Sequence, residues 1–274
     1  MQLVDLFKAI KPVIGMLHVP ALPGSPRNTL ALNAIVDWVL KDAEALADGG
    51  IDGMILENFG DVPFYPGQVP PHTVAFLTVL GREVRQLGRL GRRFDRPLGI
   101  NVLRNDAAGA MAIAAAAGAE FIRVNIHTGA RLTDQGVIEG MAHETLRYRK
   151  LLGCDVKIFA DVDVKHSAPL ARRDLAVEVE EALLRGCADA IVVTGAATGR
   201  QTAVEDLKIA KAAAGDAPVI AGSGVDVANL ATVLEVADAL IVGTSFKQDS
   251  VATNAVDAER VRTFMRAVAG FRSK

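Results

Sequence analysis

The chain has 274 residues, of which 50% are hydrophobic and 23% charged, and its 30 basic and 32 acidic side chains leave a formal charge of −2. This composition is typical of a soluble globular protein and excludes a mainly disordered chain. Charges of both signs are dispersed along the sequence, which excludes the basic surface of a nucleic-acid-binding or anionic-membrane-binding protein.

The two cysteines, Cys154 and Cys187, stand alone in apolar surroundings and fit neither a disulfide framework nor a metal-binding motif. Unpaired cysteines favour a reducing compartment. Residues 1–11 include Asp5 and lack the apolar stretch of a secretory signal. The alanine-rich, charge-free run at residues 107–119 is shorter than the about 20 residues that cross a bilayer. We therefore expect a cytoplasmic protein without a membrane span.

A short apolar run followed by a longer segment with helical spacing recurs along the chain. The pattern predicts strands at residues 13–16, 53–56, 98–102, 121–126, 157–164, 190–193, 219–221 and 239–242. It predicts helices at residues 31–48, 73–93, 106–117, 139–152, 172–185, 204–214, 227–236 and 257–269. Strands that alternate with helices pair in parallel, which leaves an eight-stranded barrel or an open doubly wound sheet.

One turn is repeated before several strands: a small residue, an acidic residue and then an apolar run. The acids are Asp52, Glu120, Asp189 and Asp238. Glycine or alanine lets the preceding helix end tightly, and we expect the acid to remain in solvent. A repeated turn indicates a repeated structural unit.

Alternating side chains in the middle strands distinguish the two architectures. In the fifth strand Ile158, Ala160 and Val162 lie on the side opposite Phe159 and Asp161. A central strand of an open sheet is apolar on both sides, whereas a barrel strand can turn polar residues into the lumen. We therefore predict an α/β fold, a single-domain (β/α)8 TIM barrel over residues 1–274, with its active site at the carboxyl ends of the strands.

Two loops are longer than their connections require and rich in proline. Residues 18–28 contain three prolines and residues 61–72 contain four. Both follow strands, which places them at the catalytic face of the barrel. Proline restricts the backbone, so a preformed rim or lid is one interpretation, and ordinary surface decoration is the alternative.

Acidic and basic residues follow the predicted strands and are candidates for catalysis. Asp161, Asp163 and Lys165 recur at every second position, and Glu57 and His18 follow strands two and one. Carboxylates that share a pocket shift each other's pKa values apart, so that one can act as an acid and another as a base. Lys165 either forms an imine with a substrate or, as we favour, an ion pair with an aspartate.

A divalent metal is a further candidate at the same end of the barrel. His18, Glu57 and Asp161 offer nitrogen and oxygen ligands, but they come from separate strands, so sequence spacing cannot test the site. The alternative is a structural role for each side chain.

Several polar residues after the middle strands are candidate substrate contacts. They are Asn101, Asn125, His127, Thr194 and Gly195. Arg131 and Arg200 lie close to two of them in the chain and offer charge for an anion. A plain surface loop is the alternative for residues 194–200.

The last two strands run into loops of glycine and hydroxyl residues. These are Gly222, Ser223 and Gly224 after strand seven, and Gly243, Thr244 and Ser245 after strand eight, with Lys247 nearby. Exposed backbone N–H groups and small side chains suit a phosphate, and barrels often bind one on these two loops. Tight turn geometry alone is the alternative reading of the glycines. The third glycine of a dinucleotide motif is replaced by Val227, so we expect no nucleotide cofactor.

The chain resembles the BtpA/SgcQ family of barrel proteins nearly end to end. The resemblance rests on Gly15-Met16-Leu17-His18, Leu22-Pro23-Gly24-Ser25-Pro26, Glu57-Asn58-Phe59-Gly60-Asp61-Val62-Pro63-Phe64, Asn101-Val102-Leu103-Arg104-Asn105-Asp106, Thr133-Asp134-Gln135-Gly136, Ala160-Asp161-Val162, Lys165-His166, Gly222-Ser223-Gly224-Val225 and Gly243-Thr244-Ser245-Phe246-Lys247. It implies a barrel similar to the ribulose-phosphate-binding group, with a phosphate site. It also implies one of two roles, a nucleosidase or sugar-metabolising enzyme, or a factor for photosystem I assembly.

These observations leave two hypotheses for function. As an enzyme, the protein binds a phosphorylated sugar or nucleotide-like small molecule and carries out acid–base chemistry, of a nucleosidase, isomerase or lyase type. As a non-catalytic assembly factor for photosystem I or another membrane complex, it uses its outer surface instead, for which the sequence shows no basic cluster. The polar lumen favours the enzyme. An apolar helical exterior makes a homo-oligomer the expected state.

Overall fold

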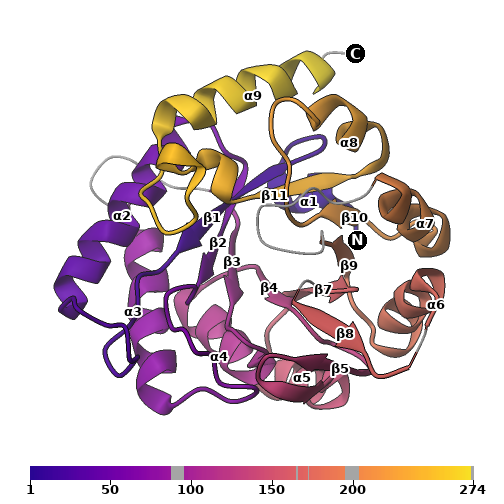
Figure 1. Cartoon of the computed structure of the whole chain (residues 1–274), viewed down its shortest axis with the longest axis horizontal. Coiled ribbons are helices and arrows are strands. Elements are labelled where there is room, and N and C mark those ends of the chain that lie inside the picture. The colour runs from indigo at the N-terminus through magenta and orange to yellow at the C-terminus, as the bar shows by residue number, and fades with distance from the viewer. Residues whose placement is uncertain (88–95, 165, 172, 195–203, 273–274) are drawn as a thin grey trace.

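Eight parallel strands form a closed barrel in the computed structural model, which describes residues 1–87, 96–164, 166–171, 173–194 and 204–272. This confirms the predicted TIM barrel. The ring order is β1-β11-β10-β9-β7-β4-β3-β2 (Figure 1). The strands are β1 (Val13–His18), β2 (Gly53–Glu57), β3 (Leu98–Asn101), β4 (Phe121–Val124), β7 (Lys157–Val162), β9 (Ala190–Val193), β10 (Val219–Ala221) and β11 (Ala239–Val242).

A ring of helices surrounds the strands (Figure 1). They are α2 (Leu32–Asp48), α3 (Pro71–Gln86), α4 (Ala107–Ala117), α5 (Ala142–Leu151), α6 (Leu175–Glu180), α7 (Val204–Ala214), α8 (Leu230–Val236) and α9 (Ala258–Arg272). Residues 88–93 of the predicted second helix lie outside the described residues. The helix predicted at 172–185 is α6 followed by a π-helix, Glu181–Arg185. Within the part of the chain described, no helix is long and apolar enough to cross a bilayer.

Strand side chains alternate between two apolar layers. Leu56, Ile122 and Ile158 face outward and belong to the large core shared with the helices. Phe121, Phe159 and their neighbours face inward and fill the lumen as a separate cluster. This is the inward and outward alternation that the sequence predicted, with one addition: the lower part of the lumen is apolar, and polar residues begin only above it.

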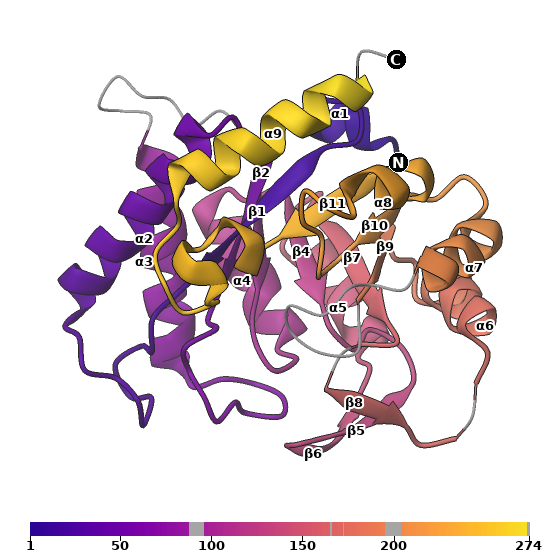
Figure 2. The same cartoon turned by 45° about the horizontal axis from the view of Figure 1, so that its top comes forward.

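A short helix that the sequence analysis did not predict, α1 (Leu3–Phe7), closes the amino-terminal end of the barrel. Its Phe7 ring contacts the Phe121 ring edge-on, with 5.8 Å between ring centroids. Phe121 in turn stacks on Phe159 at 4.5 Å. Figure 2 shows α1 beneath α9, beside the amino-terminal entry to β1. The barrel is therefore plugged at this end, so a ligand must enter from the other.

The acids of the repeated turn hold neighbouring strands together in pairs. Each carboxylate accepts a hydrogen bond from a backbone N–H in the first two residues of the adjacent strand, over 2.8–2.9 Å, and also contacts a cation. The donors are Val13 to Asp52, Leu98 to Glu120, Ile158 to Asp189 and Val219 to Asp238. The cations are Arg272, Arg85, Arg149 and Lys211 respectively. The expectation that these acids remain in solvent is wrong for Asp52, which is buried, whereas the other three side chains keep 22–38% of their surface exposed. All four carboxylates turn to the strand because its N–H groups need acceptors.

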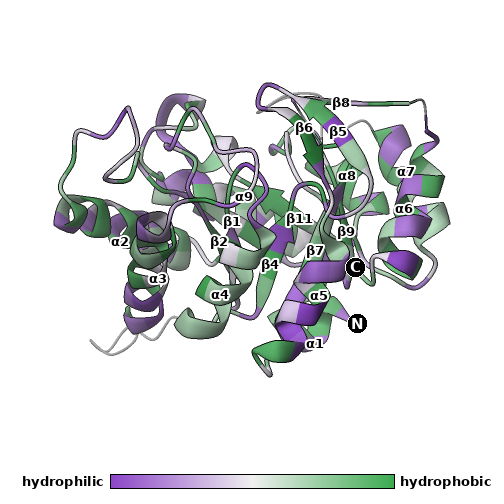
Figure 3. Cartoon of the chain, turned by 90° about the horizontal axis from the view of Figure 1, so that it is seen from below, coloured by the Kyte–Doolittle hydropathy of each residue, from purple (hydrophilic) through white to green (hydrophobic). Residues whose placement is uncertain are grey.

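A small antiparallel sheet, in the order β6-β5-β8, stands at the end of the barrel opposite α1 (Figure 3). Its strands are β5 (Ala130–Thr133), β6 (Gly136–Glu139) and β8 (Ser167–Pro169). Residue 139, predicted as the start of a helix, therefore ends a strand, and α5 begins at Ala142. Its strands belong to the segments that follow β4 and β7, so the sheet forms part of the rim at the carboxyl ends of the barrel strands.

The two proline-rich loops contact each other after β1 and β2. The backbone N–H of Leu22 donates to Asp61 Oδ1 over 2.7 Å, and Gly24 packs against the His72 ring. Burial raises the pKa of Asp61, although this hydrogen bond opposes the shift. The loops enclose a cavity of about 350 Å³. Residues 71 and 72, predicted as loop, are the first residues of α3.

Candidate active site

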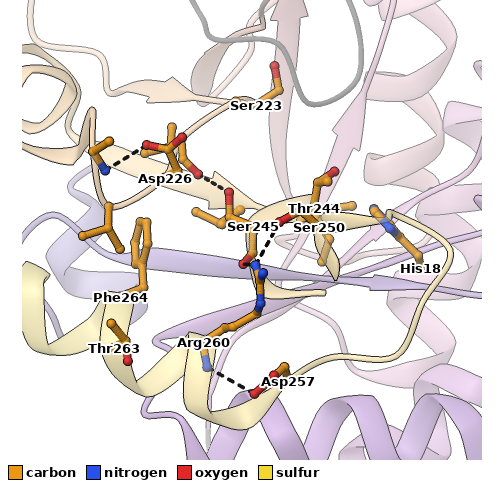
Figure 4. Close-up of a pocket in the computed structure, with 18 of the residues that line it drawn as sticks. His18, Ser223, Asp226, Thr244, Ser245, Ser250, Asp257, Arg260, Thr263 and Phe264 are labelled. Atoms are coloured by element: carbon orange, nitrogen blue, oxygen red, sulfur yellow. Dashed lines mark hydrogen bonds between the residues drawn. The ribbon is translucent and has the colours of Figure 1, made fainter. Parts of the chain in front are cut away.

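A cavity of about 920 Å³ opens where β1, β2, β10 and β11 end (Figure 4). All six residues predicted to bind phosphate line it, together with His18 and Glu57. The remaining polar lining comes from Arg123 in the lumen, from Asp226 and Ser250 in the loops, and from Asp257, Glu259, Arg260 and Thr263 around the start of α9. Residues from both ends of the sequence thus meet at one cavity, as a barrel requires.

The loops after β10 and β11 offer unused backbone donors to this cavity. Gly224 has a positive φ of 67°, a conformation that favours glycine. Within the described residues, no acceptor takes the backbone N–H of Gly224 or Thr244. Ser245 Oγ donates to the Val225 carbonyl over 2.6 Å and ties the two loops together. These features suit an anion such as phosphate.

A cation lies beside these loops, but it is not the predicted one. Lys247 is fully buried and forms an ion pair with Asp42 of α2 over 2.6 Å, so its predicted contribution to the phosphate site is wrong. Burial lowers the pKa of Lys247, which the Asp42 carboxylate partly offsets. Arg260 of α9 is placed instead at the cavity, where its Nη1 donates to the Ser245 carbonyl over 3.2 Å and to Ser250 Oγ over 2.9 Å (Figure 4).

His18 and Glu57 form a pair at the cavity wall. His18 Nε2 lies 3.8 Å from Glu57 Oε1, and the imidazole stacks on Phe59 with 4.3 Å between ring centroids. His18 Nδ1 lies 2.9 Å from the Ala252 carbonyl oxygen. Because a carbonyl only accepts, Nδ1 carries a proton. Histidine and glutamate are both residue types that transfer protons in enzymes.

Asp161 holds Arg123 in place. Arg123 Nε donates to Asp161 Oδ1 over 2.8 Å and Nη2 to Oδ2 over 2.9 Å, and Asn125 Nδ2 adds a third bond to Oδ2 over 3.0 Å. The Asp161 side chain has no exposed surface. A carboxylate with both oxygens committed in this way is suited to positioning its partners. The predicted proton-transfer role of Asp161 therefore has no support in this geometry.

Asp163 lies apart from Asp161. Because β7 ends at Val162 and Asp163 has a positive φ of 45°, the predicted row of lumen-facing polar residues is wrong beyond Asp161. The Asp163 side chain is 63% exposed and forms an ion pair with Arg131 over 2.5 Å. Lys165, the next residue of that row, lies outside the described residues.

The predicted substrate contacts lie in different places. Asn101 and Asn125 are in the lumen, where Asn101 Nδ2 donates to Asn125 Oδ1 over 3.1 Å. His127 is turned away from it, with Nε2 2.8 Å from the Gly186 carbonyl oxygen, because β4 ends before it. Thr194 is buried just after β9. Gly195 and Arg200 lie outside the described residues.

The three candidate metal ligands are not brought together. Among the residues that the structure describes, no group of three histidine, cysteine or acidic side chains could hold a metal ion. His18 and Glu57 lie side by side, but Asp161 is committed to Arg123. The predicted set of His18, Glu57 and Asp161 is thus wrong as a ligand cluster.

Three arginines at the site were not among the predicted residues. Arg123 lies on the lumen-facing side of the fourth strand, so the alternation of side chains in that strand could have identified it as a site residue. Arg104 is buried nearby, where burial lowers the pKa of its guanidinium against the opposing carboxylates of Asp161, Asp134 and Glu57. Arg260 belongs to the last helix, and nothing in its sequence pattern marks it.

The family model and a sequence relative both point to the same protein family. The model of the BtpA family matches residues 9–270. Photosystem I biogenesis protein BtpA of Synechocystis sp. is 45% identical over 275 residues, covering 100% of this chain and 94% of that protein. An uncharacterized protein of Archaeoglobus fulgidus is also 45% identical, over 261 residues, with coverage of 95% and 99%.

The fold is similar to that of solved barrel enzymes. The structure of (S)-3-O-geranylgeranylglyceryl phosphate synthase from Thermoplasma acidophilum, in complex with its substrate sn-glycerol-1-phosphate, has a TM-score of 0.61. The two chains share 13% sequence identity, and the likeness covers 98% of each. At this identity the comparison establishes the fold alone.

Proposed function

Because this chain belongs to the BtpA family, we propose that it is an enzyme acting on a phosphorylated sugar or nucleotide-like small molecule within the barrel. One observation carries the proposal: the loops after β10 and β11 and the pair His18–Glu57 line a single cavity. In this assignment the free N–H groups of Gly224 and Thr244 bind phosphate, with Arg260 adding positive charge. The solved synthase complex with sn-glycerol-1-phosphate adds a precedent on the same fold.

Proton transfer is assigned to Glu57 with His18. The Ala252 carbonyl accepts from Nδ1 and orients the His18 ring, and we assign the proton transfer to Nε2 together with the Glu57 carboxylate. Positioned acid–base groups of this kind typically contribute about 10²–10⁴ to a rate. Glu57→Gln is therefore the variant that should remove turnover of any substrate found, while phosphate binding remains.

Phosphate binding is tested first, by thermal unfolding with paired compounds. We expect sn-glycerol-1-phosphate, ribose 5-phosphate or adenosine monophosphate to raise the melting temperature, whereas glycerol, ribose and adenosine do not. A ligand at about 100 times its Kd adds about 2.7 kcal/mol to the free energy of unfolding. Thr244→Asp should abolish the effect because its carboxylate repels phosphate, and Thr244→Ser, which keeps the hydroxyl, should retain it.

Two results would count against the proposal. A wild-type protein that responds to none of the phosphorylated compounds would favour the alternative, an assembly role like that in the name of the Synechocystis relative. If phosphorylated compounds raise the melting temperature of Thr244→Asp as much as that of the wild type, the phosphate does not bind at the loop after β11. The equal identity to a cyanobacterial and an archaeal relative favours a function common to both, which suits small-molecule chemistry.

A further inference from the structure

Arg123 has no part in the phosphate site or the proton-transfer pair proposed above. Its side chain is nevertheless fixed by a network of buried hydrogen bonds. Two of its nitrogens donate to Asp161, and Asp161 also accepts from Asn125. Asn125 in turn accepts from Asn101, so that residues of β3 and β7 and the residue that follows β4 are linked through side chains. The guanidinium plane is thereby fixed in one orientation.

Stability alone does not account for this arrangement. A buried ion pair contributes little net stability, and apolar residues of similar volume often replace one without loss. The layer of the lumen directly below is already filled by apolar side chains such as Phe121 and Phe159. An apolar pair at positions 123 and 161 would continue that layer. The charges must therefore serve something besides packing.

One guanidinium nitrogen remains available to a ligand. Nε and Nη2 of Arg123 donate to Asp161, whereas Nη1 has no acceptor within the described residues. Arg123 is also among the residues that line the cavity of about 920 Å³. Burial would lower the pKa of Arg123, but the adjoining Asp161 and the more distant Glu57 raise it overall, so the group stays charged.

Arg123 faces the phosphate loops from across the barrel. In the closed ring, β4 is four strands away from β11 in either direction, so the two are diametrically opposed. A molecule with its phosphate at Thr244 and its other end in the lumen points that end towards Arg123. The Arg123 side chain is only 3% exposed, so a ligand can reach it only through the part that lines the cavity.

We propose that Arg123 binds a carboxylate of the ligand, and hence that the substrate is a phosphorylated carboxylic acid. The proposal rests on the proposed phosphate site. It adds a second anionic group to the ligand, which binds on the opposite side of the barrel from the phosphate. A fixed guanidinium recognises a carboxylate better than an uncharged hydroxyl, because a charge-assisted hydrogen bond is about twice as strong as a neutral one. Asp161 and Asn125 are positioning residues for this contact.

Two probes that differ in one group test the proposal. 3-Phosphoglycerate carries a carboxylate where sn-glycerol-1-phosphate carries a hydroxymethyl group. By calorimetric titration, we expect the wild-type protein to bind 3-phosphoglycerate about tenfold more tightly or better, as charge-assisted bonds allow. Glycerate, which lacks the phosphate, should bind weakly. Equal affinity for the two phosphorylated probes would overturn the assignment of Arg123.

The variants separate binding from folding. Arg123→Met alone leaves the Asp161 charge buried and is expected to unfold the barrel, so the informative variant is Arg123→Met with Asp161→Leu, which removes both charges. In this double variant, both phosphorylated probes should bind with equal affinity, within about twofold of the wild-type value for sn-glycerol-1-phosphate. A preference for 3-phosphoglycerate that persists there would also overturn the proposal.

Failure of the phosphate site looks different. If neither phosphorylated probe binds the wild-type protein, both proposals fall. If both probes bind and Thr244→Asp weakens both, the phosphate site stands, and the ratio of the two affinities alone decides the role of Arg123.

Discussion

At the scale of a single residue, His127 illustrates how burial separates a structural histidine from a reactive one. It is 1% exposed, and its Nε2 lies 2.8 Å from the carbonyl oxygen of Gly186, so this nitrogen carries the proton. Its Nδ1 is buried, and no partner for it exists among the described residues. Burial therefore lowers the pKa of His127, because a second proton on Nδ1 would have no acceptor.

A pH dependence of stability follows from this lowered pKa. In the unfolded chain the pKa of His127 is about 6.5, whereas the folded protein takes up this proton only at lower pH. As the pH falls below about 6.5, the unfolded state binds the proton first, so the free energy of unfolding decreases by at most about 1.4 kcal/mol per pH unit. The loss ends once the pH falls below the lowered pKa of the folded state.

Urea unfolding of the wild-type protein and of His127→Gln between about pH 7.5 and about pH 5.5 measures this effect. Glutamine can keep the donor to Gly186 but cannot be protonated. All other side chains are the same in both proteins, so the difference between the two curves isolates His127. Parallel curves would mean that burial does not shift its pKa.

At the scale of the elements, the repeated acid before every second strand organises the barrel as four similar pairs. β1–β2, β3–β4, β7–β9 and β10–β11 each share one such carboxylate. The carboxylate accepts a hydrogen bond from a strand N–H, and the nearby cation offsets the charge of the carboxylate. The repetition in sequence therefore reflects a repeated unit of two strands.

Asp189→Ala tests one of these contacts. It removes the acceptor of the Ile158 N–H and the partner of Arg149, so we expect a loss of about 1–3 kcal/mol in the free energy of unfolding. Asp155→Ala is the matched control, because the Asp155 side chain is 90% exposed and its pair with Lys157 contributes at most about 1 kcal/mol. Both values come from urea unfolding. Similar losses in the two variants would contradict a special role for the repeated acid.

The sequence predicted the elements of this barrel well and its site in part, for physical reasons. Hydrophobic periodicity located all eight strands because each buries its outward face against helices. Glycine and hydroxyl residues marked the loops after β10 and β11 because backbone donors need small neighbours. Lys247 was misplaced, since the side chain that partners it, Asp42, is distant in sequence. Asp163 was misplaced because the end of a strand depends on pairing, which periodicity does not show.

At the scale of the whole molecule, the apolar plug and the candidate site lie at opposite ends of the barrel. α1 and the inward aromatic rings fill the amino-terminal end, whereas the cavity opens at the carboxyl-terminal end. Between them, Arg123 and Asp161 form the boundary where apolar packing gives way to hydrogen bonds. The separation means that the two ends can be altered independently.

Phe7→Ala and Thr244→Asp test this independence as a pair. Phe7 is 1% exposed and packs against Phe121, so its truncation should lower the free energy of unfolding by about 3–5 kcal/mol. At a temperature where the variant is folded, its affinity for sn-glycerol-1-phosphate should equal that of the wild type, because no atom at the cavity has changed. Thr244→Asp should do the reverse, weakening the ligand while changing stability by less than about 1 kcal/mol. Urea unfolding and calorimetric titration measure the two quantities, and a folded Phe7→Ala protein that binds as poorly as Thr244→Asp would show that the plug and the cavity are coupled through the lumen.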